Sequence, residues 1–147
     1  MHHALARTLK LMDNHSFRTH AVIVFVLVLA TLGVAAIWGG LALFFAATCA
    51  WMAPVAALDV VVLLRLAGLP GGRQRLVASL LITACAIVAG GFTVAALRIG
   101  AAFGTLPHHA LYQIGPELAA TWWQMNISGW DVALILTALP LAWVLGR

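Results

Sequence analysis

Two ionisable side chains, Asp59 and Arg98, lie within long apolar stretches of this sequence. Charge is costly in apolar surroundings, so residues of this kind are candidates for a functional site. In the next apolar stretch, the hydroxyls of Ser79 and Thr83 fall at a depth comparable to that of Asp59. Asp59, Ser79 and Thr83 therefore form a candidate buried polar site, in which a carboxylate and two hydroxyls would bind a proton or a cation.

A structural role is the alternative for Asp59. Its carboxylate would then pair with a basic residue or form a hydrogen bond with a neighbouring helix. The nearest basic residues that follow it in the sequence are Arg65, Arg73 and Arg75. The sequence leaves both interpretations open.

Arg98 lies near the end of the apolar stretch that it interrupts. Its aliphatic stem allows the guanidinium to extend toward water, where Asp131 or Glu117 would pair with it. Arg98, Asp131 and Glu117 are therefore a candidate site at the external face. In the functional interpretation Arg98 contacts an anion or a lipid headgroup there, and in the structural interpretation these residues form ion pairs.

Four threonines lie at similar distances from the predicted external ends of the apolar stretches: Thr31, Thr48, Thr93 and Thr137. If all four faced inward, they would form a polar layer beneath Arg98. The simpler interpretation is that each hydroxyl donates to a carbonyl of its own helix, as threonine usually does in membrane helices.

No catalytic residue, metal site or cofactor is predicted. His108, His109 and Glu117 match no specific zinc signature, although a metal site outside the membrane is an alternative for them. Cys49 and Cys85 lie in apolar stretches without a Cys-x-x-Cys pair, so both are expected to act as small hydrophobic residues.

The composition indicates which elements position these residues. Of the 147 residues, 64% are hydrophobic and 8% are charged, whereas soluble domains carry about 25% charged residues. So few charges cannot cover a water-exposed surface, and lipid is the solvent that suits the remainder. The net charge of +4 does not indicate nucleic-acid binding, because the basic residues flank apolar stretches instead of forming a tract.

The apolar runs predict an all-α fold, an integral membrane four-helix bundle made of two helical hairpins. Residues 1–147 form a single transmembrane domain with spans at about 21–38, 41–64, 76–98 and 130–146. The first two spans are expected to turn at Gly39-Gly40. A cleaved signal peptide is the alternative for the first run.

Seven of the eight Lys and Arg residues fall on one predicted side of the membrane. The positive-inside rule then places both termini in the cytoplasm of a multi-pass cell-membrane protein, in the inner membrane if there are two. The segment 1–20 is cytoplasmic, either disordered or a short amphipathic helix with Leu5, Leu9 and Met12 on one face. In the external loop 105–130, Pro116 to Asn126 is predicted to be an interfacial or re-entrant helix, with a plain connecting loop as the alternative.

Three functions are compatible with this organisation. The first is a non-enzymatic accessory or scaffold subunit, which contacts membrane lipids and either a membrane-protein partner or further copies of itself. The second is a small oligomeric transporter or channel that uses Asp59. The third is a membrane enzyme acting at the external face through His108, His109 and Glu117.

Overall fold

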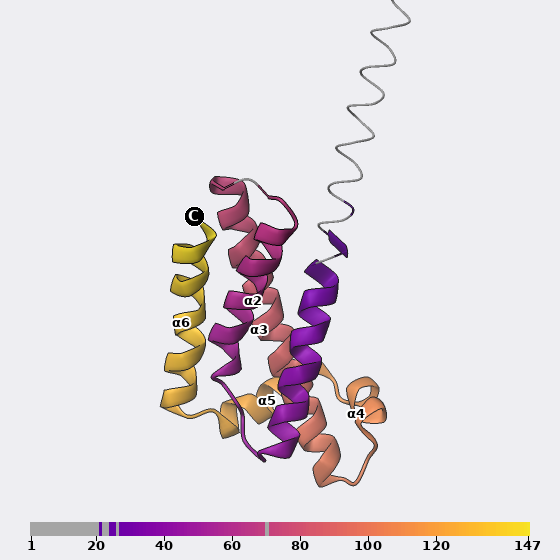
Figure 1. The fold of residues 1–147 in the computed structure, drawn as a ribbon. Coiled ribbons are helices and arrows are strands. Elements are labelled where there is room, and N and C mark those ends of the chain that lie inside the picture. Colours follow the sequence, from indigo (N-terminus) through magenta and orange to yellow (C-terminus); the bar gives the residue numbers. More distant parts are fainter. Residues whose placement is uncertain (1–20, 22–23, 26, 70) are drawn as a thin grey trace, which may run out of the picture.

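The computed structural model describes residues 21, 24–25, 27–69 and 71–147. The prediction of a cytoplasmic segment over residues 1–20, with or without an amphipathic helix, lies outside these residues. Every regular element of the described residues is a helix, as the sequence predicts (Figure 1). The helices are Leu27–Phe44, which is called here the N-terminal helix, α2 (Met52–Leu66), α3 (Arg73–Ala102), α4 (Pro107–Gln113), α5 (Pro116–Asn126) and α6 (Gly129–Gly146).

Three of the described helices are long and apolar enough to cross a membrane: the N-terminal helix, α3 and α6. The helix α2 has 15 residues, which correspond to a length of about 22 Å. This is less than the roughly 30 Å of a bilayer's hydrocarbon core. The second predicted span, 41–64, is therefore not one helix: residues 41–44 end the N-terminal helix, residues 45–51 are non-helical, and α2 starts at Met52.

The predicted turn at Gly39-Gly40 is wrong, because the N-terminal helix continues through both glycines to Phe44. A Cβ atom on Gly39 would lie 2.6 Å from Thr93 Cγ2 of α3 and 2.7 Å from Leu97 Cδ1. Gly39 therefore allows two helices to approach closely. The chain turns instead in residues 45–51, called here the linker, which returns from the end of the N-terminal helix to α2 (Figure 1).

The glycine-rich breaker after α2 ends one helix and precedes the next. Gly68 has φ of 76° and Gly72 has φ of 127°, values at which any residue with a Cβ atom would be strained. The helix α3 starts at Arg73 directly afterwards and contains the whole third apolar run. Pro54 lies in the first turn of α2, where a missing N–H costs little, whereas Pro140 lies within α6.

Small residues fill the interior between the helices. Ala53 and Ala57 of α2 and Ala138 and Ala142 of α6 are each 0% exposed. They form one core cluster with Trp38 of the N-terminal helix, which is also 0% exposed. Alanine at these positions lets helix backbones come close, and close packing is what stabilises helix association where water does not drive it.

Two neighbouring glycines of α3, Gly90 and Gly91, each contact a tryptophan of another element. A Cβ atom on Gly90 would clash with the indole of Trp38. The carbonyl of Gly91 accepts a hydrogen bond of 2.6 Å from Nε1 of Trp123 in α5. The pair Gly90-Gly91 thus positions both the N-terminal helix and α5 on α3.

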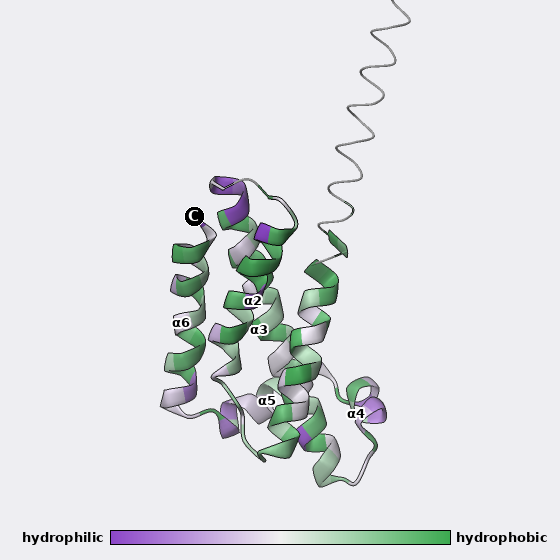
Figure 2. Cartoon of the chain, viewed as in Figure 1, coloured by the Kyte–Doolittle hydropathy of each residue, from purple (hydrophilic) through white to green (hydrophobic). Residues whose placement is uncertain are grey.

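Arginines hold the C-terminal part of α6 at one end of the molecule, which is called here the arginine end. Arg65 Nη2 donates to the carbonyl of Leu145 at 2.9 Å, and Arg75 Nε donates to that of Gly146 at 3.2 Å. These carbonyls belong to the last turn of a helix, where they have no intrahelical partner. Figure 2 shows hydrophilic residues at this end and at the opposite end, with apolar helices between.

The opposite end is called here the α5 end, because it holds α4, α5 and the start of α6 (Figure 1). The helix expected over Pro116 to Asn126 is present as α5 with these bounds. Helix α4 was not predicted from the sequence; it packs on α3 where Ala110 meets Gly100. The start of α6 has a capping box made by Ser128 and Asp131.

The neighbouring glycines of the N-terminal helix offer a matched test of its path. Gly39→Ala should lower the stability by about 1–3 kcal/mol, because the new methyl group would overlap with Thr93 and Leu97. Gly40→Ala, which has no neighbouring atom within 4 Å, should raise it by up to about 1 kcal/mol through helix propensity. Thermal unfolding in one detergent measures both. Destabilisation by Gly40→Ala as large as that by Gly39→Ala would contradict a continuous helix.

Candidate functional site: a polar pocket at Arg98 and a lateral apolar cavity

Arg98 lines a pocket of about 270 Å³ at the α5 end, called here the Arg98 pocket. Its guanidinium-bearing side chain is half-buried. The other lining residues are Ala46, Ala47 and Thr48 of the linker and Trp122 and Asn126 of α5. A guanidinium and a side-chain amide at one pocket are suited to bind an anionic oxygen group such as a carboxylate or phosphate.

The linker that forms one wall of this pocket has an unusual backbone. Ala46 has φ of 52° and Cys49 has φ of 49°. Positive φ is uncommon for residues other than glycine, and it persists only where surrounding contacts hold it. One such contact is the hydrogen bond of 2.9 Å that Trp38 Nε1 donates to the carbonyl of Thr48. Cys49 itself is 4% exposed, so the linker is anchored inward by its side chain as well.

Asp131 provides the second anchor of the linker. Its Oδ1 accepts a hydrogen bond of 3.0 Å from the Thr48 hydroxyl. Its Oδ2 accepts from the backbone N–H of Ser128 at 2.9 Å and from the Ser128 hydroxyl at 2.8 Å. One carboxylate thus joins the linker to the first turn of α6.

The structure brings together two of the three residues that were grouped at the external face. Thr48 connects Arg98 and Asp131, because it lines the pocket with the first and donates to the second. Glu117 is exposed in the first turn of α5 and does not line the pocket. A negative charge at that position favours the helix by interacting with its dipole.

The threonines do not form a common polar layer. Thr31, Thr93 and Thr137 each donate to a carbonyl of their own helix, at 2.9, 2.8 and 2.6 Å. This agrees with the simpler interpretation for those three residues. Thr48 is the exception, because it lies in the linker and not in a helix, a position that the apolar run did not reveal.

The structure does not join Asp59 to the two hydroxyls that were grouped with it. Asp59 is half-buried on α2. The Ser79 hydroxyl is hydrogen-bonded to two carbonyl oxygens, at 2.8 Å to Leu76 and 3.2 Å to Ala142. The Thr83 hydroxyl is buried and has no hydrogen-bond partner within the part of the chain that the structure describes. Of the arginines considered as partners for Asp59, Arg65 and Arg75 donate to carbonyls of α6, and Arg73 is exposed at the start of α3.

The remaining candidates do not converge on one position. His108 and His109 are exposed on α4, with ring centroids 4.3 Å apart. No group of three or more His, Cys, Asp or Glu side chains suited to a metal ion occurs among the described residues. Cys49 is buried in the linker, and Cys85 is exposed on the apolar middle of α3.

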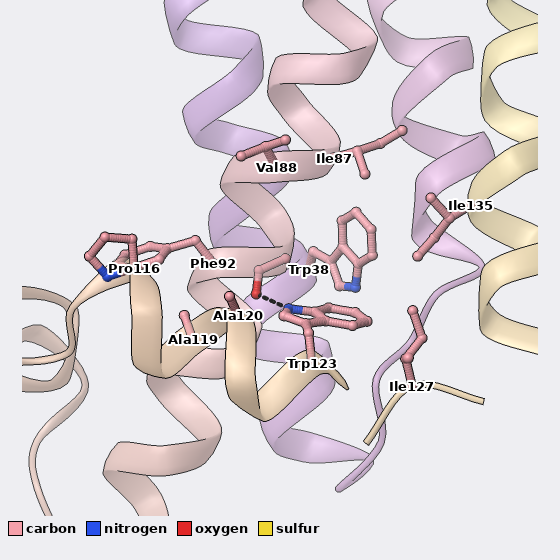
Figure 3. Close-up of a pocket in the computed structure, with 11 residues that line it drawn as sticks. Trp38, Ile87, Val88, Phe92, Pro116, Ala119, Ala120, Trp123, Ile127 and Ile135 are labelled. Atoms are coloured by element: carbon pink, nitrogen blue, oxygen red, sulfur yellow. Dashed lines mark hydrogen bonds between the residues drawn. The ribbon is translucent and has the colours of Figure 1, made fainter. Parts of the chain in front are cut away.

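A second space, the lateral cavity, lies at the adjacent face of α5 and has a volume of about 370 Å³. In Figure 3 the indoles of Trp38 and Trp123 lie next to each other, with Phe92 and Pro116 on one side and Ile135 on the other. The full lining is Trp38, Ile87, Val88, Gly91, Phe92, Pro116, Ala119, Ala120, Trp123, Ile127 and Ile135, all of them apolar residues or glycine.

Both indole N–H groups beside the cavity are already used. Trp123 donates to Gly91, as the dashed line in Figure 3 marks, and Trp38 donates to Thr48. The cavity therefore presents hydrocarbon and aromatic surface. Sequence reasoning missed it, although the adjacent Trp122 and Trp123 were a signal: the first lines the Arg98 pocket and the second lines the lateral cavity.

Comparisons of the chain with protein-family models, with curated proteins and with solved structures give no match.

Removing the Asp131 carboxylate should release the linker. We expect Asp131→Ala, in a Cys85→Ala background, to raise the rate at which a maleimide labels Cys49 by about 5–30-fold, because a tether of one or two kcal/mol is lost. Glu117→Ala, which removes an exposed carboxylate from α5, is the matched control and should leave the rate unchanged. Equal labelling of Cys49 in the two variants would show that Asp131 does not hold the linker.

Proposed function

We propose that this chain is a multi-pass membrane protein with four crossings, arranged as a helical bundle. The support is the apolar surface that its long helices expose. Leu29 of the N-terminal helix is 62% exposed, Leu81 of α3 is 62% exposed and Leu136 of α6 is 59% exposed. Apolar patches of this extent are rare on soluble monomers, and hydrocarbon is the environment in which they are stable.

The linker and α2 together make the second crossing of this bundle. Helix α2 covers about 22 Å, and the linker supplies the rest of the path toward the α5 end. Non-helical backbone inside a membrane is tolerated where protein covers it or where it lines a cavity. Different parts of the linker meet one condition each, since Cys49 and Ala50 are buried and Ala46 to Thr48 line the Arg98 pocket.

The arginine end faces the cytoplasm in this proposal. Arg65, Arg73, Arg75 and Arg147 all lie near that end, whereas the α5 end has Arg98. Positive charge accumulates on the cytoplasmic side of membrane proteins. The N-terminal helix starts on the same side as the C-terminus (Figure 1), so the proposal places both termini in the cytoplasm. The membrane in this proposal is the cell membrane, the inner one where there are two.

Two exposed glutamines test this orientation. Gln74 lies at the arginine end and Gln124 lies in α5. In a variant without native cysteines, Gln74→Cys should react with a membrane-impermeant maleimide only after the cells are opened, and Gln124→Cys should react on intact cells. Labelling of both positions from the same side would reject the arrangement, because the two ends would then not be separated by a membrane.

We further propose that the protein is a non-enzymatic accessory or scaffold subunit of a membrane assembly. The observation that carries this role is that three interior polar side chains bond to the protein's own backbone: Ser79 to α6, Trp38 to the linker and Trp123 to α3. Hydrogen bonds also join elements at each end: Arg65 of α2 bonds to α6 at the arginine end, and Asp131 of α6 bonds to the linker at the α5 end. A rigid module with an apolar outer surface fits a structural role.

A transporter or channel that uses Asp59 is the alternative. It is favoured by the buried Thr83 hydroxyl, which has no partner within the described chain. An unpaired buried hydroxyl costs about 1–3 kcal/mol and marks a position where a transported ion or water would be stabilised. The half-buried Asp59 would then supply the charge.

One preparation separates the two roles. Extracted from its native membrane in polymer nanodiscs, the protein should be found in a discrete complex with a different membrane protein, at fixed stoichiometry by native mass spectrometry. The purified chain in liposomes should conduct neither protons nor cations, and Asp59→Asn should change nothing. Recovery as a homo-oligomer whose flux is abolished by Asp59→Asn would establish the alternative, and recovery as a lone monomer without flux would contradict both.

A further inference from the structure

We propose that the α5 end binds one anionic phospholipid, with an acyl chain in the lateral cavity and the headgroup at Arg98. The inference rests on membrane insertion and is independent of the accessory role. Its basis is that two spaces of opposite character lie on one side of α3 and share α5 as a wall.

The lateral cavity fits a hydrocarbon chain. An apolar cavity of about 150 Å³ in a soluble protein stays dry and binds benzene, and the cavity here measures about 370 Å³. This leaves room for roughly a dozen carbon atoms. Because both indole N–H groups beside it already donate to backbone carbonyls, an occupant with polar groups along its chain gains nothing there.

The cavity also lies where lipid chains would reach it. Val88, one of its lining residues, is 72% exposed on α3 and belongs to the apolar middle of that helix. The cavity is therefore open at the surface that hydrocarbon contacts in a bilayer. Water is a poor occupant, since a water molecule needs two to four polar partners.

Arg98 supplies the charge complementarity. It follows Gly91 by seven residues, which places it on the same face of α3 and about 10 Å farther toward the end of the helix. An anionic phospholipid has the same arrangement along its length, because its charged headgroup lies nearer the membrane surface than its acyl chains. The Asn126 amide, which also lines the Arg98 pocket, donates one N–H to the Trp122 carbonyl, and its second N–H can donate to a phosphate oxygen beside Arg98.

The sequence of α5 matches this division. Ala119 and Trp123 line the lateral cavity, whereas Trp122 and Asn126 line the Arg98 pocket. On a helix these two pairs occupy adjacent faces. A phospholipid bound beside α5 would therefore contact the lateral cavity with its acyl chain and the Arg98 pocket with its headgroup.

The experiment uses the full-length protein in nanodiscs with photoactivatable lipids that carry a diazirine in the acyl chain. Phosphatidylglycerol is the anionic probe, phosphatidylcholine is the zwitterionic probe, and a diazirine-bearing isoprenoid quinone is the neutral probe. Crosslinked peptides are located by mass spectrometry. Phosphatidylglycerol should label the peptide that contains Val88 and Phe92 about tenfold more than either other probe.

Two variants with a matched control decide between specific and general lipid contact. Ala120 is exposed on α5 beside the cavity, so Ala120→Phe fills the cavity from a position with room to grow and should lower the labelling about tenfold. Ala133→Phe adds the same ring at an exposed position of α6 that does not line the cavity, and should leave the labelling unchanged. Arg98→Gln should remove the preference for phosphatidylglycerol and leave a low, equal labelling by all three lipids.

Thermal unfolding of each variant shows whether it is folded. Equal labelling by the anionic and neutral probes in the unaltered protein would overturn the assignment of an anionic lipid. Unchanged labelling in a folded Ala120→Phe variant would overturn the cavity as the chain's binding site. Neither result bears on whether the protein has a membrane partner, so this inference and the accessory role fail separately.

Discussion

The carboxylate of Asp131 is the point on which the arrangement of the α5 end depends. It closes the capping box at the start of α6 and accepts the Thr48 hydroxyl at 3.0 Å. The linker contains two residues with positive φ and lacks helical hydrogen bonds over most of its length. In a membrane, such backbone must find its partners within the protein. Trp38 provides one by donating to the Thr48 carbonyl, and Asp131 holds the same residue by its side-chain hydroxyl, so together they fix where α2 starts.

The position of α5 follows from a second local constraint. Gly90 makes room for Trp38, and the carbonyl of neighbouring Gly91 accepts the Trp123 indole. Trp38 in turn donates to Thr48, so one chain of contacts runs from α5 through α3 and the N-terminal helix to the linker. Because α5 docks through a large ring near the middle of α3, it does not pack flush against Phe92 and Ile135. The lateral cavity is the space that remains.

The sequence was sufficient where the signal is local. Glycines and a proline after α2 predict its end, a proline predicts the start of α5, and apolar runs predict α3 and α6. The prediction of a turn at Gly39-Gly40 was wrong, because a sequence does not distinguish a glycine that forms a turn from a glycine that lets two helices pack closely. Only the structure shows Thr93 and Leu97 opposite Gly39. The site was harder still, because the bond between Thr48 and Asp131 joins residues 83 positions apart, and no spacing rule relates them.

The arginines show how surroundings determine what one residue type does. At the arginine end, Arg65 and Arg75 donate to carbonyls left free at the end of α6, and the Arg147 guanidinium lies 5.2 Å from the centre of the Trp143 ring. These side chains stabilise a helix end, where a positive charge also interacts favourably with the helix dipole. Arg98 lies within α3, whose carbonyls are used by the helix itself, and it lines a pocket with a hydroxyl and an amide. A half-buried cation in that position gains most from an anionic group that comes from outside the chain, which makes the α5 end the part of the molecule suited to bind a ligand.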